Sequence, residues 1–254
     1  MTTRFDLSKK VAMVTGGSRG LGLAIAKGFA QHGADVAVIS TKRSCELEEQ
    51  IADASGVKVK VKSYGFDLSN FEAYDELIDN IKSDFGTIDI LLNNAGVQRR
   101  SPAADFPMDD FDFVLDINLK APFMLCQKVA KIMIEKGRGK IINMASLLSF
   151  QGGLNVPAYT ASKSAVMGFT KSMSNEWAKF GINVNCIAPG YVATDMNEAL
   201  LADETRNRQI LERIPMGRWA NPEDMTGAAI FLASSASDYI SGTTIIVDGG
   251  WMGR

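Results

Sequence analysis

Short apolar runs alternate with longer segments of helical apolar spacing along most of this 254-residue chain. The short runs predict strands, and they lie at Val11–Val14, Val36–Ser40, Val57–Tyr64, Ile88–Leu92, Lys140–Met144, Ile182–Ala188 and Thr243–Val247. The segments between them are long enough for the helical crossovers that parallel neighbouring strands require. The pattern therefore predicts an α/β fold with a doubly wound parallel sheet of about seven strands flanked by helices.

No low-complexity linker and no internal repeat divides the chain, so residues 1–254 are predicted to form a single domain. The longest interruption of the alternation, residues 191–219, lies between the sixth predicted strand and the helix begun by Asn221-Pro222-Glu223. In such sheets ligands bind beyond the carboxyl ends of the strands. We therefore expect residues 191–219 to form a lid over a site at that edge.

Composition narrows the possible partners and locations. Hydrophobic residues make up 46% of the chain, and the net charge is −2 at pH 7. The Lys and Arg residues are scattered, so neither nucleic acid nor an anionic membrane is an expected partner. The sequence has no apolar signal-peptide region near its start and no uninterrupted apolar stretch of about 18 residues. A cytoplasmic protein is therefore expected.

The cysteine and histidine residues argue against two kinds of chemistry. Cys45, Cys126 and Cys186 are widely separated and lack CxxC spacing, so we expect no metal site and interpret them as reduced, half-buried residues. The run Gly16–Gly20 also matches the nucleophile-elbow pattern of hydrolases. The only histidine, His32, precedes Gly33, where a helix C-cap is expected. A Ser-His-acid hydrolase would therefore lack its base.

The segment Thr15–Gly22 forms a predicted glycine turn between the first strand and a helix over Leu23–Ala30. Glycines let such a Rossmann-type turn approach a pyrophosphate, whose charge is met by free N–H groups at the start of the helix. The glycine spacing differs from the plain dinucleotide fingerprint, and a tight turn without a ligand is the alternative. The candidate cofactor residues of this turn are Gly16, Ser18, Arg19, Gly20, Leu21 and Gly22.

Three further predicted strands end at short segments that we expect to meet at the nucleotide, and these are Asn93-Asn94-Ala95-Gly96, Ser146 and Pro189-Gly190.

Tyr159 and Lys163 are four residues apart and so share one face of a helix. A cation at about 4 Å, with an effective dielectric near 20, interacts by roughly 4 kcal/mol, which could lower the phenol pKa by up to about 3. Tyr159 could then exchange protons near neutral pH. The alternative for an isolated pair of this kind is an exposed helix face.

At this point the chain resembles the short-chain dehydrogenase/reductase family over essentially its whole length. The matching elements are Thr15–Gly22, Asp67 after the third strand, Asn93–Gly96, Asn118, Ser146, Tyr159 with Lys163, and Pro189-Gly190 with Thr194. The resemblance implies a homotetramer and a catalytic tetrad of Asn118, Ser146, Tyr159 and Lys163. It also implies that Asp67 lies near the adenine, and that Asn94 and Val192 lie near the ribose and nicotinamide. Further candidate cofactor residues are Leu68, Ala95, Gly96, Pro189, Gly190 and Thr194.

The implied reaction is hydride transfer between nicotinamide C4 and the carbon of a ketone or secondary alcohol. In the resembling family, the residues matching Ser146 and Tyr159 bind and protonate the carbonyl oxygen. Lys163 is expected to hold the nicotinamide ribose and to lower the pKa of Tyr159. Asn118 is expected to fix a water through which Lys163 reaches solvent.

Cofactor choice depends on the end of the second strand, where an acid would repel a 2′-phosphate. Ser40-Thr41-Lys42-Arg43 has no acid there, and Arg19 lies in the glycine turn. Ser40, Lys42 and Arg19 are therefore candidate cofactor residues, and NADP(H) is favoured over NAD(H). The alternative is that the cations are solvated and NAD(H) is used.

Four longer stretches resemble the branch of this family that contains the 2-keto-3-deoxygluconate and gluconate 5-dehydrogenases, and they are Ile142–Gly153, Asn175–Lys179, Arg213–Trp219 and Ser234–Gly242. Those enzymes act on sugar acids. Arg99 or Arg100 could bind a carboxylate, Gln151 and Asn197 could serve hydroxyl groups, and Ser146 and Tyr159 would meet the reacting carbonyl.

Several alternatives remain open at this point. Arg99 and Arg100 could belong to a solvated loop, and Gln151 could be a loop-stabilising amide. Trp251 could reach a neighbouring subunit or pack in the core beside the last strand. A 3-oxoacyl-thioester reductase would carry the same tetrad, and a nucleotide-sensing scaffold without turnover would keep the fold.

Overall fold

The computed structural model describes residues 3–254 and confirms the predicted fold class, with seven parallel strands in one sheet. The strands are β1 (Val11–Thr15), β2 (Asp35–Ser40), β3 (Val61–Gly65), β4 (Ile90–Asn93), β5 (Gly139–Met144), β6 (Ile182–Pro189) and β7 (Thr244–Val247). Their order across the sheet is β3-β2-β1-β4-β5-β6-β7. The order reverses between β1 and β4, where doubly wound sheets open a crevice for a ligand.

The strand boundaries differ from the predicted ones mainly at β3. Residues 57–60 were expected in this strand, but the ladder with β2 begins at the pair Val36 and Val61. β2 itself starts only at Asp35, whose Oδ1 accepts a hydrogen bond from the backbone N–H of Lys60 at 2.6 Å. Lys60 therefore meets the first residues of β2, Asp35 and Val36, and the ladder begins one residue later, which an apolar pattern cannot reveal.

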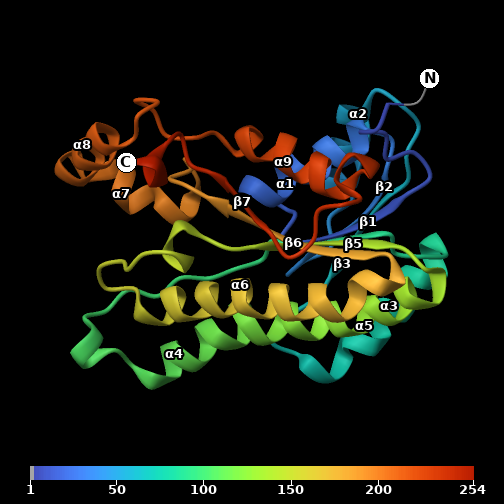
Figure 1. The fold of residues 1–254 in the computed structure, drawn as a ribbon, viewed down its shortest axis with the longest axis horizontal. Coiled ribbons are helices and arrows are strands. Elements are labelled where there is room, and N and C mark those ends of the chain that lie inside the picture. The colour runs from blue at the N-terminus through green and yellow to red at the C-terminus, as the bar shows by residue number, and fades with distance from the viewer. Residues whose placement is uncertain (1–2) are drawn as a thin grey trace.

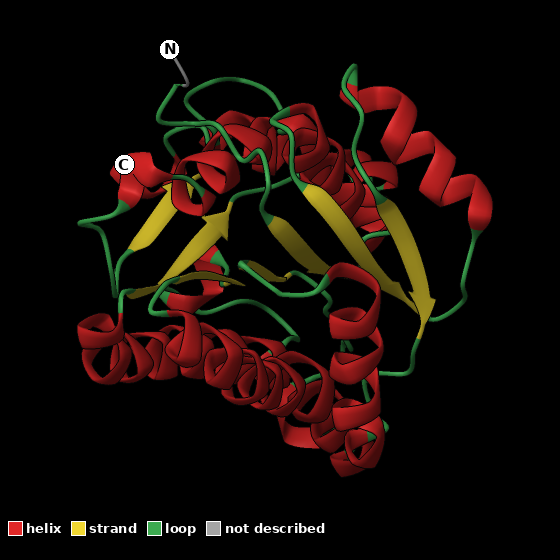
Figure 2. Cartoon of the chain, turned by 90° about the vertical axis from the view of Figure 1, so that its right-hand side faces the viewer, coloured by secondary structure: helices red, strands yellow, loops and turns green. Residues whose placement is uncertain are grey.

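Helices cover both faces of the sheet (Figures 1 and 2). They are α1 (Gly20–Gln31), α2 (Cys45–Ser55), α3 (Tyr74–Phe85), α4 (Met108–Leu115), α5 (Ala121–Lys136), α6 (Pro157–Trp177), α7 (Glu198–Ala202), α8 (Glu204–Arg213) and α9 (Thr226–Ala233). Figure 1 shows α1, α2 and α9 on one face and α3, α5 and α6 on the other. This is the layering that right-handed crossovers on both sides of a parallel sheet produce.

The two faces of the sheet contribute to two separate apolar cores. Val14 of β1 packs in the core that contains Ile25 of α1 and Ala229 of α9. Its neighbour Met13 packs in the other core, with Ile81 of α3 and Val129 of α5. Successive strand residues point to opposite faces, and both faces are buried. This explains why the strands appear in the sequence as continuous apolar runs.

The cysteines are free thiols, but the expectation that they are half-buried is wrong. Cys126 on α5 and Cys186 on β6 are fully buried in the packing of helices against the sheet. Cys45 is exposed because it is the first residue of α2, directly after the N-cap Ser44.

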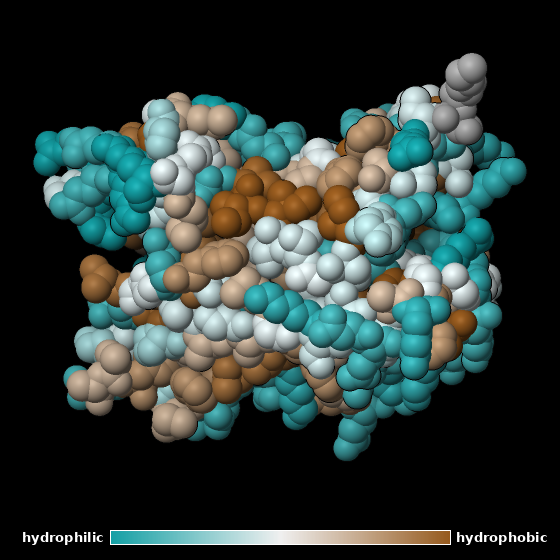
Figure 3. All heavy atoms as spheres, in the orientation of Figure 1, coloured by the Kyte–Doolittle hydropathy of each residue, from teal (hydrophilic) through white to brown (hydrophobic). Residues whose placement is uncertain are grey.

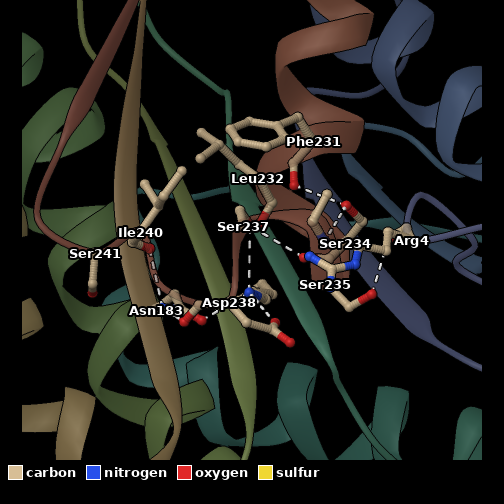
Figure 4. Close-up of polar contacts among 12 residues, drawn as sticks. Arg4, Asn183, Phe231, Leu232, Ser234, Ser235, Ser237, Asp238, Ile240 and Ser241 are labelled. Carbon is tan, nitrogen blue, oxygen red and sulfur yellow. Dashed lines mark hydrogen bonds and ion pairs between the residues drawn. The ribbon is translucent and has the colours of Figure 1, made fainter.

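The two ends of the sheet differ. At the amino-terminal ends of β5 and β6, the loop after α9 forms a polar cluster, in which Lys140 Nζ donates to Asp238 Oδ1 at 2.8 Å and Asn183 Nδ2 donates to the backbone oxygen of Ile240 at 3.0 Å (Figure 4). At the other end, α7 and α8 extend beyond the sheet (Figure 1). The space-filling view shows the surface notched beneath these two helices (Figure 3). The predicted site residues lie at this second end.

Candidate active site

The glycine turn after β1 adopts a conformation that requires glycine. Gly16 has φ +64°, and a Cβ there would lie 2.9 Å from the Cα of Ala95, so the turn touches the loop after β4. A Cβ on Gly22 would lie 2.2 Å from the carbonyl oxygen of Gly16. The N-cap of α1 is Arg19, whose side chain makes no capping hydrogen bond, and the first turn has no acidic residue. The amides at the start of α1 are thus free of side-chain caps, which suits a pyrophosphate.

Thr15 joins this turn to the loop after β4. Its hydroxyl accepts hydrogen bonds from the backbone N–H groups of Asn94 at 3.0 Å and Ala95 at 3.1 Å. The Asn94 amide in turn donates to the carbonyl oxygens of Thr15 and Gly16. Sequence reasoning placed Asn94 here but gave Thr15 no role. The sequence does place a threonine as the last residue of the strand, directly before the glycines, and this position could have indicated that Thr15 holds the turn.

The end of β2 is the predicted cofactor-selective corner. Ser40 Oγ donates to the backbone oxygen of Lys42 at 2.7 Å, and the Arg43 Nε lies 3.6 Å from Glu48 Oε1. The Lys42 side chain is exposed. Asp67, after β3, is also exposed, and its Oδ1 accepts hydrogen bonds from the Ser69 N–H and hydroxyl, which lower the pKa of the Asp67 carboxyl. Asp67 is therefore ionised at neutral pH.

Ser146 lies directly beyond β5, as predicted, and caps a short 3₁₀ turn. Its Oγ accepts a hydrogen bond from the Leu148 N–H at 3.2 Å, and the Ser149 Oγ accepts one from the Ser146 N–H at 3.3 Å. Ser149 Oγ also donates to the backbone oxygen of Lys163 at 2.7 Å. The serine loop is thereby held against α6, the helix that carries Tyr159 and Lys163.

Tyr159 and Lys163 share one face of α6, with the Lys163 Nζ 5.7 Å from the Tyr159 ring centroid. Lys163 Nζ donates to the backbone oxygen of Met144, the last residue of β5, at 2.6 Å. Burial lowers the pKa of Lys163 to about 8. Burial also raises the pKa of Tyr159, although a hydrogen bond with Ser146 lowers it in part. The expected lowering of the Tyr159 pKa is therefore wrong here, because burial raises this pKa more than the hydrogen bond with Ser146 lowers it, and the phenol stays protonated at neutral pH.

Asn118 lies in a π-helical turn, residues 116–120, between α4 and α5. Such turns recur at functional sites because they redirect one side chain within a continuous helix. The buried Asn118 amide accepts a hydrogen bond from the Val97 N–H and donates to the Val97 oxygen, both at 2.8 Å. A Cβ on Gly96 would lie 3.3 Å from Asn118 Oδ1 and 3.8 Å from Lys163 Nζ. The structure thus brings Asn118, Gly96 and Lys163 together.

The segment after β6 folds back toward the glycine turn. Gly190 packs against Asp248, since a Cβ there would lie 2.7 Å from the Asp248 Cα. Val192 is buried and forms a β-bridge with Ala220 at the far end of the segment. The Asn197 amide donates to the backbone oxygen of Val192 at 2.9 Å, so this candidate substrate residue also braces its own loop.

Two residues of this region were missed by sequence reasoning. Asp195 Oδ2 lies 2.9 Å from Nη1 of Arg19, so Arg19 contacts the segment after β6. The two residues are 176 positions apart, and no local signal could have paired them. Tyr191 packs between Trp219 and Trp251, edge to face with the first ring (centroids 5.3 Å apart) and tilted against the second (4.8 Å). Trp251 is 5% exposed, which places it in an apolar cluster of its own chain.

The candidate substrate arginines differ in their partners. The Arg99 Nε lies 3.2 Å from Asp110 Oδ1, and its guanidinium lies 4.9 Å from the Phe113 ring centroid. Arg100 Nη2 donates to Gln98 Oε1 at 3.2 Å. The loop that carries both arginines is tied to the loop before Tyr159 by a hydrogen bond between the Ser101 N–H and the Asn155 oxygen at 3.0 Å. Gln151 accepts a hydrogen bond from the Trp251 indole at 3.4 Å.

Within residues 3–254, no group of three or more His, Cys, Asp or Glu side chains is arranged to hold a metal ion. Over the same residues, no helix combines the length and apolar character needed to cross a membrane.

Comparisons with known proteins cover the whole of this site. A family model described as enoyl-(acyl carrier protein) reductase matches residues 16–252. The 2-dehydro-3-deoxy-D-gluconate 5-dehydrogenase of Escherichia coli is 51% identical over 251 residues, which is 98% of each chain.

Two solved structures are similar over almost all of this chain. One, from Agrobacterium tumefaciens, is provisionally assigned as a 2-deoxy-D-gluconate 3-dehydrogenase and holds NADP; its TM-score is 0.92, with 47% identity, covering 99% of this chain and 100% of its own. The other, from Beutenbergia cavernae, is provisionally assigned as an NAD(P)-dependent gluconate 5-dehydrogenase with NADP at low occupancy. Its TM-score is 0.93, with 41% identity, and the match covers 99% of this chain and 100% of its own.

Proposed function

Because the chain belongs to the short-chain dehydrogenase/reductase family, we propose that it is an NAD(P)-dependent oxidoreductase acting on a small sugar acid. It interconverts a ketone and a secondary alcohol at C5 of 2-keto-3-deoxygluconate (2-dehydro-3-deoxygluconate) or of gluconate. The proposal is carried by one arrangement: the Ser149 bridge holds the Ser146 loop against α6 at Lys163, whose Nζ lies 5.7 Å from the Tyr159 ring centroid. The chain that has it is 51% identical to 2-dehydro-3-deoxy-D-gluconate 5-dehydrogenase.

The proposed cofactor site runs across the carboxyl ends of β1, β2, β4 and β6. Its residues are Gly16, Ser18, Arg19, Gly20, Leu21, Gly22, Ser40, Lys42, Asp67, Leu68, Asn94, Ala95, Gly96, Tyr159, Lys163, Pro189, Gly190, Val192 and Thr194. The glycine positions that cannot accept a Cβ, together with the uncapped start of α1, fit a pyrophosphate. When bound, the nicotinamide supplies or accepts the hydride.

NADP(H) is the cofactor we favour over NAD(H). Neither Ser40 nor Thr41 is acidic, so nothing at the end of β2 repels a 2′-phosphate. Lys42 is exposed and forms no ion pair within the described residues. The two solved structures described above also contain NADP.

The chain's own groups handle the proton in this proposal. Ser146 donates a hydrogen bond to the carbonyl oxygen, which strengthens as negative charge develops there. Tyr159 donates its proton as the alkoxide forms, since burial raises its pKa and keeps the phenol protonated at neutral pH. Lys163 binds the ribose hydroxyls, and Asn118, held by Val97, fixes a water that links Lys163 to solvent. In the oxidation direction the step runs in reverse, so the phenolate form of Tyr159 accepts the proton.

Arg100 is the residue we assign to the substrate carboxylate. Arg99 already has an acidic partner in Asp110 and a ring contact with Phe113. Within residues 3–254, the Arg100 side chain hydrogen-bonds only to the neutral amide of Gln98. A guanidinium can bind a carboxylate with two parallel hydrogen bonds, which fixes both position and direction. Gln151 and Asn197 are assigned to substrate hydroxyl groups.

The remaining parts of the proposal concern assembly and location. Residues 191–219 act as a lid, supported by the apolar cluster that joins Ile210 of α8 and Ile214, the residue after α8, to Trp251. We propose a homotetramer in the cytoplasm, supported by apolar side chains left partly exposed on β7 and α5, among them Ile246 and Phe123. Light scattering on the purified protein tests the tetramer.

The substrate assignment is tested with a panel of substrates, by measuring NADPH or NADH formation in the oxidative direction and its consumption in the reductive direction. The panel contains 2-keto-3-deoxygluconate, gluconate, the neutral sugar glucose and, in the reductive direction, acetoacetyl-CoA as the 3-oxoacyl thioester. We expect turnover of a sugar acid and little or none of the neutral sugar or the thioester. If sugar acids are inert while acetoacetyl-CoA is reduced, the assigned substrate is wrong.

The carboxylate anchor is tested with Arg100→Ala, using Arg99→Ala as the matched control. Loss of a charge-assisted hydrogen bond costs about 1.5–3 kcal/mol, so KM for the acid should rise roughly tenfold or more in Arg100→Ala. If neither substitution changes KM for the acid, no carboxylate binds at this loop.

A further inference from the structure

The ion pair between Arg19 and Asp195 lies across the mouth of the proposed cofactor site. Both side chains are largely exposed, at 79% and 70%, and their charged atoms are 2.9 Å apart. The surrounding loops also touch, because a Cβ on Gly20 would lie 3.5 Å from Cγ2 of Thr194. The segment after β6 therefore places a carboxylate over the glycine turn, where a cofactor would bring phosphate groups.

The glycine turn that carries Arg19 also borders the corner where a 2′-phosphate would lie. The glycine turn is bonded to the end of β2, since the backbone N–H groups of Gly16 and Gly17 both donate to the Ile39 oxygen, at 2.8 Å and 3.3 Å. Ile39 directly precedes Ser40, and the loop from Ser40 carries Lys42. The Arg19 guanidinium therefore has two possible anionic partners, Asp195 and a 2′-phosphate.

From this geometry we propose that Asp195 is a specificity-determining residue that competes with the cofactor 2′-phosphate for Arg19. This inference rests on the proposed use of NAD(P). When NADPH binds, Arg19 must leave Asp195 before it can serve the 2′-phosphate. NADH has no 2′-phosphate and leaves the ion pair in place. Asp195 therefore weakens the preference for NADPH that the cations at this corner create.

The size of the effect follows from the exposure of the pair. Exposed ion pairs contribute at most about 1 kcal/mol, which corresponds to about a fivefold change in an equilibrium constant. Removing the Asp195 charge should thus raise the ratio of the NADH to the NADPH dissociation constant by about three- to fivefold. Most of that change should come from tighter NADPH binding.

Binding titrations of the full-length protein with NADPH and with NADH, without sugar acid, test this competition. The variants are Asp195→Asn, the matched control Glu198→Gln, Arg19→Ala and the double variant Arg19→Ala/Asp195→Asn. Glu198 is an exposed acid in the same segment, so its substitution removes the same charge without touching Arg19. We expect the ratio of the NADH to the NADPH dissociation constant to rise in Asp195→Asn and to stay nearly constant in Glu198→Gln. The double variant should have the same ratio as Arg19→Ala alone.

Three results would overturn the inference: a change below twofold in Asp195→Asn, an equal change in Glu198→Gln, or an undiminished effect without Arg19. Because no substrate is present, this outcome is separate from the substrate proposal. Inert sugar acids with the expected shift in the ratio would leave this inference standing, whereas binding of neither dinucleotide would overturn both.

Discussion

Replacing Lys163 with Met should remove a destabilising contribution that is present near neutral pH and fades as the pH rises. Burial lowers the pKa of Lys163 from 10.5 to about 8 in the folded chain. At neutral pH the folded protein therefore holds an ammonium group where the neutral amine is preferred. The interval between the two pKa values corresponds to about 3 kcal/mol of destabilisation. Met removes this cost because it is apolar and of similar length.

The sign of the pH dependence follows from proton uptake on unfolding. Between about pH 8 and pH 10.5 the unfolded chain binds the Lys163 proton more strongly than the folded chain, so the wild type gains stability as pH rises through this range. The cost is present in full below about pH 8. The variant's advantage should therefore shrink by about 2 kcal/mol between about pH 7 and pH 9.5.

A second effect of the substitution does not depend on the Lys163 proton. Met cannot donate to the Met144 carbonyl oxygen, which Lys163 Nζ contacts at 2.6 Å, and an unpaired buried acceptor costs about 1–3 kcal/mol. This cost shifts the difference in unfolding free energy between the variant and the wild type by the same amount at every pH. The change of that difference with pH is therefore the quantity that tests the burial of Lys163.

Urea unfolding of the wild type and Lys163→Met at several pH values measures this change directly. Lys171→Met, an exposed position two turns further along α6, is the control for removing a lysine from this helix. A difference between wild type and Lys163→Met that changes by less than about 0.5 kcal/mol over this range would refute the account of burial. Lys163→Met should also be catalytically inactive, so stability and function oppose each other at this residue.

Three further outcomes are expected. Tyr159→Phe should lower kcat by roughly 10²–10⁴-fold while changing the cofactor dissociation constant little, because only the proton-donating hydroxyl is lost. If the variant kept more than about a tenth of wild-type kcat, Tyr159 would not be the proton donor. Gly22→Ala should weaken cofactor binding and lower the melting temperature, since the new Cβ would lie 2.2 Å from the Gly16 oxygen; wild-type affinity in this variant would show that the turn does not hold the cofactor. The wild type should have a higher kcat/KM with NADPH than with NADH, and Ser40→Asp should invert this order by repelling the 2′-phosphate. A wild-type preference for NADH of about tenfold would show that the end of β2 does not favour NADPH.

Features set by short stretches of sequence were predictable. The glycine turn, the strand-end positions of Asn94 and Ser146, and the shared helix face of Tyr159 and Lys163 each depend on a few neighbouring residues, and the structure has them where they were expected. The resemblance to the short-chain dehydrogenase/reductase family is likewise confirmed.

Features set by burial or by distant pairs were not predictable. The four-residue spacing of Tyr159 and Lys163 fixed their proximity, but it could not show that burial would dominate the pKa of both groups. The ion pair of Arg19 with Asp195 depends on how the segment after β6 folds back over the sheet. The position of Asn118 depends on a π-helical turn that no spacing rule indicates.

The position of the oxidised carbon tests the central claim most directly. Two relatives differ on this point, since one is a 2-dehydro-3-deoxy-D-gluconate 5-dehydrogenase and the other is provisionally assigned as a 2-deoxy-D-gluconate 3-dehydrogenase. The protein is incubated with ¹³C-labelled 2-keto-3-deoxygluconate and NADP⁺, and the product is followed by ¹³C NMR. We predict a new carbonyl resonance at C5 that forms with NADPH and is absent in Tyr159→Phe. No turnover, or oxidation at another carbon, would contradict the account.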